Sequence, residues 1–326
     1  MKIYNYLFLI MMMFGTFLVL CSNSWFSIWM GLEINLMAFI PLINKKFNLL
    51  STESSMKYFL VQALASSILL MSIILLILFN FKLNNLIMNS ALLMKMGAAP
   101  FHFWIPSVSE GLDWMNLLLL LTWQKIAPFV VLFNNMNYEF LLVIIMITSI
   151  VGAVGGLNQT SLRKLMTYSS INHLSWMLLS ILYNKNIWII YFFIYSLISL
   201  ITFLVFYYLK AFYINQLMFN INNFLFKFLI FCNFLSLGGL PPFLGFLPKW
   251  MILESLSLSN PFLLTILVMM TIVSLNFYLR MTYFAFSLCM NSNKWILSKM
   301  NYFMLIWLSL TSFSGLLMIL YIYTLF

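Results

Sequence analysis

Long apolar stretches dominate this sequence and constrain its fold more than any other feature. A transmembrane helix needs about 20 apolar residues, and about eleven such stretches follow one another with short polar connections. Lys, Arg, Asp and Glu make up only 7% of the chain, too few to give a soluble globule of 326 residues a charged surface. The stretches are continuous rather than alternating, which disfavours a transmembrane β-barrel. The sequence therefore predicts an all-α polytopic membrane protein.

The polar connections are too short to hold a soluble domain, so residues 1–326 are predicted to form a single membrane domain. The expected spans lie at about 3–20, 25–43, 55–79, 87–105, 115–134, 139–157, 162–183, 186–209, 222–257, 260–286 and 301–323.

Basic residues fall unequally on the two sides of the membrane when the expected spans are crossed in turn. One side receives mainly Lys82 and Lys185. The other receives Lys2, Lys45, Lys46, Arg163, Lys164, Lys210, Lys294 and Lys299. This asymmetry follows the positive-inside rule. It places the N-terminus on the basic side, and the odd number of spans places the C-terminus opposite.

The residues that would hold a cofactor, a metal or a nucleic acid are missing from this chain. The net charge of +10 comes from basic residues scattered singly at span ends, which act as membrane-surface anchors. Cys21, Cys232 and Cys289 have no CxxC spacing, and no Cys or His cluster is suited to an iron–sulfur centre. The sequence also lacks the Gly-rich nucleotide motifs. We expect no metal, no bound cofactor and no nucleic-acid partner in this chain.

The composition indicates an AT-rich genome. Arg occurs only at Arg163 and Arg280, whereas Phe 34, Met 25 and Tyr 16 are abundant. Membrane physics gives no reason to prefer Lys over Arg so strongly. The excess of Met suggests a genetic code with additional Met codons, as in animal mitochondria.

Two expected spans are interrupted by matching Gly and Pro residues. Segments 97–106 and 239–248 both fit G-x-x-P-F-x-x-aromatic-aliphatic-P and are offset by 239 − 97 = 142 residues. Pro removes a backbone donor, and irregular backbone at membrane depth persists only where protein or water covers it. Paired interruptions in two halves are typical of inverted-repeat transporters and of their ion paths. We therefore expect broken helices near 95–106 and near 238–249.

Four charged residues fall at membrane depth, where a charge costs about 2.5–3.5 kcal/mol or more. They are Glu33 in the second span, Lys95 before the first interruption, Lys125 in the fifth span and Lys249 after the second interruption. Burial favours the neutral form of Lys, whereas Arg keeps its proton, so a row of such groups suits proton transfer. The alternative is that each Lys extends to the surface or forms a structural ion pair. His173, among polar neighbours in the seventh span, is a candidate relay.

These segments together resemble the antiporter-like membrane subunits of respiratory complex I. The resemblance rests on the Glu33 segment, 95–106, 122–128, 165–176 and 238–250, and covers essentially the whole chain. It implies an antiporter-like inverted repeat, with Glu33 and Lys95 as the acid–lysine pair, Lys125 as the central lysine and Lys249 as the lysine of the second broken helix. With the composition, it indicates a mitochondrial member from an animal, with an insect as the expected source.

The resemblance also implies the location and partners of the chain. The expected location is the mitochondrial inner membrane, with the N-terminus in the matrix and the C-terminus in the intermembrane space. Other membrane-arm subunits and inner-membrane lipids are the expected partners. NADH, FMN, iron–sulfur clusters and ubiquinone are expected in other subunits, so this chain would couple their electron transfer to proton translocation. A cation/proton antiporter subunit and a purely structural scaffold remain as alternatives.

Overall fold

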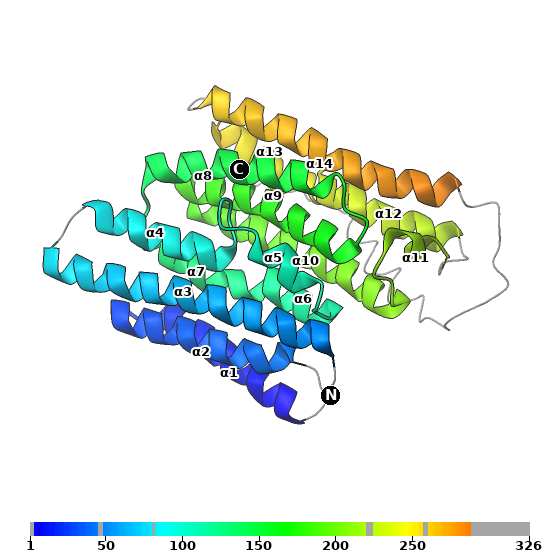
Figure 1. Ribbon diagram of the computed structural model, residues 1–326. Coiled ribbons are helices and arrows are strands. Elements are labelled where there is room, and N and C mark those ends of the chain that lie inside the picture. The colour runs from blue at the N-terminus through cyan, green and yellow to red at the C-terminus, as the bar shows by residue number, and fades with distance from the viewer. Residues whose placement is uncertain (1–2, 45–47, 80–81, 220–223, 257–259, 288–326) are drawn as a thin grey trace. The chain divides into compact units, whose positions relative to one another are not determined.

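Helices account for all the regular structure in the computed structural model, which describes residues 3–44, 48–79, 82–219, 224–256 and 260–287 (Figure 1). No β-strand occurs in those ranges, where the β-type pairing consists of one isolated bridge between Ser161 and Tyr213. The helices are α1 (Ile3–Cys21), α2 (Trp25–Ile43), α3 (Leu49–Phe79), α4 (Lys82–Met96), α5 (Trp104–Ser109), α6 (Trp114–Leu121), α7 (Trp123–Asn134), α8 (Tyr138–Gly156), α9 (Leu162–Tyr183), α10 (Lys185–Leu209), α11 (Ile214–Phe219), α12 (Phe224–Gly238), α13 (Phe246–Leu256) and α14 (Pro261–Ser287).

Seven helical stretches among the described residues are long and apolar enough to cross a membrane. They are α1, α2, α3, α6 with α7, α8, α10 and α14. The prediction of an all-α membrane protein is confirmed. The expected spans at 87–105 and 222–257 coincide with pairs of shorter helices instead, and the expected span at 301–323 lies outside the described residues.

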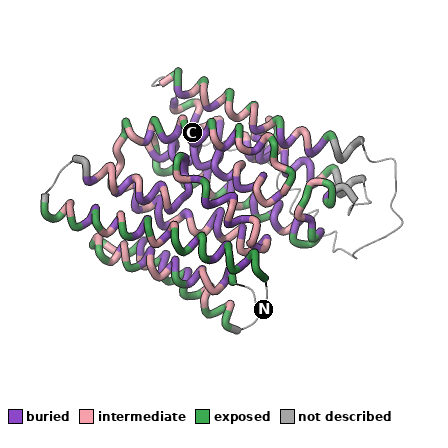
Figure 2. The backbone as a smooth tube through the Cα atoms, in the orientation of Figure 1, coloured by how far each residue is buried: buried purple, intermediate pink, exposed green. Residues whose placement is uncertain are grey.

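The chain packs as two compact units, Met1–Ile147 and Thr148–Phe326. In the first unit, α1 packs on α2, α2 on α3 and α3 on α4, and α7 contacts α1, α2 and α4. Buried and exposed residues alternate along α1 to α3 in Figure 2, because one face of each helix packs on protein while the other stays exposed. The exposed side chains include Ile10, Phe17 and Leu64, which suit contact with lipid.

In the second unit, α9 is the most enclosed helix. It contacts α10, α13 and α14, and nearly all of its residues from Leu165 to Ile181 are buried. Its Ser, Asn and His side chains make it too polar to count among the seven apolar stretches. Because neighbouring helices cover it, those polar groups are shielded from lipid, and this is the arrangement that the membrane interior requires.

Candidate functional site

The first Gly-Pro segment (97–103) separates α4 from α5. Gly97 has a φ of +73°, a left-handed conformation in which a side chain costs about 1–2 kcal/mol. The N–H of Ala98 donates to the carbonyl of Leu93 at 3.0 Å, and the N–H of Ile105 donates to His102 at 3.1 Å. The first bond is the Schellman closure of a helix C-terminus, so α4 ends because glycine permits the reversal.

The second Gly-Pro segment (239–245) repeats this local geometry between α12 and α13. Gly239 has a φ of +78°, the N–H of Leu240 donates to Leu235 at 3.3 Å, and that of Leu247 donates to Leu244 at 3.3 Å. Each of these positions lies 142 residues after its counterpart in the first segment. The same offset separates the end of α12 from the end of α4 (238 − 96 = 142) and the start of α13 from the start of α5 (246 − 104 = 142). The sequence repeat is therefore also a repeat of backbone hydrogen bonding.

Lys249 binds the C-terminal end of α12. Its Nζ donates to the carbonyl of Gly238 at 2.8 Å and lies 6.0 Å from the centroid of the Trp176 ring, while its residue is only 6% exposed. The final carbonyls of a helix have no partner within the helix and carry the negative end of its dipole. The interruption of the helix therefore supplies the acceptor that a buried ammonium group needs.

Replacement of Gly239 should disturb this contact directly. A Cβ at Gly239 would lie 2.8 Å from both Cδ and Nζ of Lys249, in a backbone conformation that alanine disfavours by about 1–2 kcal/mol. We expect Gly239→Ala to lower the amount of assembled protein on native gels. Gly238→Ala is the matched control, because its Cβ would meet no atom closer than 3.5 Å. Equal yields from the two variants would contradict this interpretation.

Lys95 lies in the last turn of α4 and is 8% exposed. Two neutral donors bind the carbonyls around it. Gln62 Nε2 donates to the Lys95 carbonyl at 3.2 Å, and Trp104 Nε1 donates to the Met94 carbonyl at 3.1 Å. Lys249 donates to the end of a neighbouring helix, α12, whereas Lys95 lines a small pocket.

Lys125 lines the same pocket from α7 and is only 2% exposed. The backbone changes direction just before it, at Thr122, where α6 ends with φ −114° and ψ −75°. Beside Lys125, Gln124 Nε2 donates to Asn35 Oδ1 at 3.0 Å and links α7 to α2. The sequence pattern at 115–134 did not predict this change of direction. The break at Thr122 places Lys125 in the first turn of α7 rather than in the middle of a continuous helix.

Glu33 supplies the negative charge near this pocket. Its Oε1 is buried and has no hydrogen-bond partner among the described residues. Its carboxylate acts electrostatically on both Lys95 and Tyr58, and Tyr58 is a buried residue that lines the pocket with the two lysines. A buried carboxylate oxygen without a partner is costly unless it gains a proton or a donor. Glu33, Lys95 and Lys125 thus form one cluster of ionisable groups in the first unit.

His173 lies on α9 in the second unit, where its Nδ1 is 2.9 Å from the Tyr191 hydroxyl. The ring also packs on Tyr195, with 4.9 Å between centroids. His102, in the first Gly-Pro segment, has a buried Nδ1 without a hydrogen-bond partner among the described residues and stacks on Phe103. The polar neighbourhood expected around His173 is present, since Ser169, Ser170 and Asn172 are all buried.

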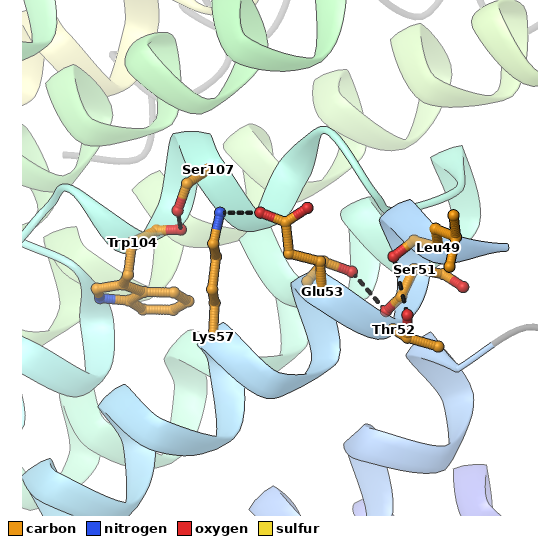
Figure 3. A network of polar contacts seen from close by, with 8 residues as sticks. Leu49, Ser51, Thr52, Glu53, Lys57, Trp104 and Ser107 are labelled. Carbon is orange, nitrogen blue, oxygen red and sulfur yellow. Dashed lines mark hydrogen bonds and ion pairs between the residues drawn. The ribbon is translucent and has the colours of Figure 1, made fainter.

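Lys57 shows how a surface lysine differs from the buried ones. Figure 3 shows its ammonium group meeting the Glu53 carboxylate one turn earlier on α3. The Nζ–Oε1 distance of this pair is 2.6 Å. The two side chains are 45% and 58% exposed. An exposed pair of this kind contributes about 0.3–0.5 kcal/mol. This exposed position suits a membrane-surface anchor, and a similar role suits Lys210, which ends α10 at the surface.

Comparison with known proteins places this geometry in a family. The model of the family "NADH:quinone oxidoreductase/Mrp antiporter, TM" matches residues 22–84 and 79–274. NADH-ubiquinone oxidoreductase chain 2 of Anopheles gambiae is 52% identical, with 99% of this chain and 98% of that protein covered. The protein of the same name from Locusta migratoria is 43% identical, with 90% and 89% covered.

Solved structures share the fold at lower identity. A chain of respiratory complex I from Thermus thermophilus superposes with a TM-score of 0.86 at 22% identity, covering 97% of this chain and 78% of that one. A chain of the Mrp complex from Dietzia sp. superposes with a TM-score of 0.75 at 16% identity, covering 84% and 59%. The antiporter-like fold inferred from the motifs is thus confirmed. The chain belongs to the NADH:quinone oxidoreductase/Mrp antiporter membrane family and, within it, to the NADH-ubiquinone oxidoreductase chain 2 proteins.

Proposed function

We propose that the chain is a core membrane subunit of respiratory complex I that couples electron transfer in other subunits to proton translocation. The observation that carries the proposal is the pocket shared by Lys95 and Lys125, with the Glu33 carboxylate in electrostatic range. The lysines are 8% and 2% exposed. A purely structural scaffold would have no use for two buried amines on one pocket, since burying each charge is costly.

The arrangement suggests how a proton would move within the first unit. Desolvation favours the neutral form of a buried lysine, whereas a nearby carboxylate favours the charged form. A change in the distance between Glu33 and Lys95 would therefore decide whether Lys95 holds its proton or releases it toward Lys125. The Gln124–Asn35 bond of 3.0 Å fixes α7 against α2 and so holds the pocket in shape. Lys125 would act as the central carrier.

In the second unit, Lys249 and His173 would continue the transfer. Lys249 lies beside the second Gly-Pro segment, where it can exchange its contact with the Gly238 carbonyl for a contact with water. His173 can relay a proton through Nδ1 and the Tyr191 hydroxyl, which lie 2.9 Å apart. The complete row would be Glu33, Lys95, Lys125 and Lys249, with His173 as a relay.

The architecture that goes with this proposal has about eleven transmembrane helices in a single membrane domain. In it, α4 with α5 and α12 with α13 are two discontinuous helices of an inverted repeat. The offset of 142 residues in helix ends and backbone bonds supports this interpretation. We expect an experimental structure of the assembled complex to relate the two helix pairs by a pseudo-two-fold axis in the membrane plane. A relation by simple translation would refute the inverted repeat.

The assembly that we propose for this chain is an NADH-ubiquinone oxidoreductase, the enzyme for which its relatives are named. The partners would be other membrane-arm subunits and the lipids of the mitochondrial inner membrane. NADH, FMN, iron–sulfur clusters and ubiquinone would be bound in other subunits. To test this assembly, the chain is captured from detergent-solubilised mitochondria, and the captured material is assayed for NADH:ubiquinone reductase activity and for its size. Recovery of NADH:ubiquinone reductase activity in a large complex would support the proposal, whereas recovery of a small cation/proton antiporter would overturn it.

The proposed orientation places the N-terminus in the matrix and the C-terminus in the intermembrane space. It follows from the basic residues, of which Arg163, Lys164 and Lys210 lie at helix ends of the expected matrix side. A protease added to mitochondria with a ruptured outer membrane should therefore remove a tag placed after Phe326. Removal of that tag only from inverted inner-membrane vesicles would contradict the orientation.

A further inference from the structure

Three tyrosine hydroxyl groups gather inside the second unit, and the proposed function has not yet used them as a set. Tyr191 and Tyr195 project from α10 and Tyr278 projects from α14, with exposures of 1%, 4% and 1%. Tyr191 and Tyr195 both pack on the ring of His173, and Tyr278 lies on α14, which contacts the same helix α9. A phenol hydroxyl both donates and accepts hydrogen bonds, so a buried group of three forms a potential path for protons.

One end of this cluster contacts His173. Its Nδ1 lies 2.9 Å from the Tyr191 hydroxyl, and its ring packs edge-on against Tyr191 and obliquely on Tyr195. The hydrogen bond fixes which ring nitrogen faces the tyrosines. The imidazole is therefore attached to the tyrosine cluster.

The other end of the cluster lies at the second Gly-Pro segment. Tyr278 packs over Gly238, where an added Cβ would come within 3.6 Å of its Cδ2 atom, and the carbonyl of Gly238 accepts the 2.8 Å bond from Lys249. Phe277 and Phe234 hold the ring, with centroids at 4.4 and 6.3 Å. Tyr278 thus packs against the residue that Lys249 binds.

The hydroxyl of Tyr278 is buried and interacts with the Ser169 side chain of α9, yet no partner among the described residues meets full hydrogen-bond geometry. A phenol of this kind costs about 1–3 kcal/mol if it stays unpaired, whereas phenylalanine would fill the same space without that cost. Buried polar atoms without a hydrogen-bond partner among the described residues also occur on two helices that contact α14, at Asn172 Oδ1 and Trp176 Nε1 of α9 and at Asn233 Oδ1 of α12. Trp176 is also the ring that Lys249 Nζ approaches at 6.0 Å. Packing alone gives no reason for a tyrosine at position 278.

We propose that Tyr278 transfers protons between the His173–Tyr191 pair and Lys249, with water completing the hydrogen bonds of its hydroxyl. In each transfer the hydroxyl gives up its own proton to one neighbour as it takes a proton from the other. The O–H bond is re-formed, no electron moves, and the phenol stays neutral. The inference rests on the proposed function, because it needs Lys249 and His173 to exchange protons.

The test measures NADH-driven proton uptake in vesicles containing the assembled complex. Tyr278→Phe keeps the ring and removes only the hydroxyl. We expect it to lower the initial rate of proton uptake about tenfold, which is less than the roughly 10²–10⁴-fold contribution that a placed proton-transfer group usually makes. Tyr283→Phe is the matched control, since Tyr283 lies on the same helix with 68% exposure. It should keep the full rate. A purely structural role for Tyr278 would instead lower the amount of complex while leaving uptake per complex unchanged.

Lys249→Ala separates this inference from the proposed function. Loss of uptake in Lys249→Ala together with full uptake per complex in Tyr278→Phe would overturn the role of Tyr278 and leave the proposed function standing. Full uptake in both variants would overturn both. If Tyr278→Phe does not assemble, Tyr191→Phe decides in its place, because it removes the 2.9 Å contact with His173. A tenfold loss there would support the tyrosine path, and an unchanged rate would overturn it.

Discussion

Lys125→Ala should leave the complex assembled and lower NADH–ubiquinone turnover by about 100-fold, the lower end of the usual effect of removing a proton-transfer group. Lys125 is 2% exposed and lines the same pocket as Lys95, so the substitution removes one of the two buried amines of that pocket. The measurement is the rate of ubiquinone reduction per assembled complex, with the amount of complex taken from native gels.

Lys125→Arg distinguishes a proton carrier from a fixed positive charge. Arginine keeps the charge but does not release its proton near neutral pH. We therefore expect Lys125→Arg to be as slow as Lys125→Ala. Lys57→Ala is the matched control, because Lys57 is 45% exposed and paired with Glu53 at the surface. A fast Lys125→Arg variant would show that charge alone suffices.

Glu33→Gln should lower coupled turnover by about tenfold or more, because it removes a charge while keeping the size of the side chain. The carboxylate acts on both Lys95 and Tyr58, and its buried Oε1 lacks a partner among the described residues. The substitution removes the carboxylate that acts on Lys95, and a nearby carboxylate favours the protonated form of a lysine. Glu53→Gln is the matched control, since Glu53 is 58% exposed. Equal rates in the two variants would contradict the role of Glu33.

The sequence predicted the helical elements closely because the membrane leaves few alternatives. Backbone groups in lipid must be bonded within their own segment, so an apolar stretch of sufficient length is a helix. The expected spans at 25–43 and 162–183 match α2 and α9 to the residue. The helix ends at Met96 and Gly238 fall inside the predicted interruptions, because glycine at positive φ and the following Pro stop a helix wherever it lies.

The parts that the sequence did not predict depend on tertiary contacts. The change of backbone direction at Thr122 has no Gly beside it, and Pro128 lies within α7 rather than at its start. The amides of Gln62, Asn35 and Gln124 gained their roles only when α2, α3, α4 and α7 met around the pocket. Their spacing in the sequence, 35, 62 and 124, carries no periodic signal that would have grouped them with Lys125.

The tyrosine cluster was missed for a related reason. Aromatic residues are abundant throughout this chain, and most of them pack or face lipid, so Tyr191, Tyr195 and Tyr278 did not stand out. His173 did stand out, because a histidine is rare at membrane depth. The structure is what separates Tyr278, 1% exposed, from Tyr283, 68% exposed and five residues later on the same helix.

Proton uptake by vesicles that contain the Lys125 variants tests the central claim most directly. Each vesicle preparation is supplied with NADH and ubiquinone, and proton uptake is recorded together with NADH oxidation. If the buried lysines carry the coupled protons, NADH-driven uptake is lost in both Lys125→Ala and Lys125→Arg, although both complexes assemble. Full uptake by either variant would show that Lys125 is not an obligatory proton carrier.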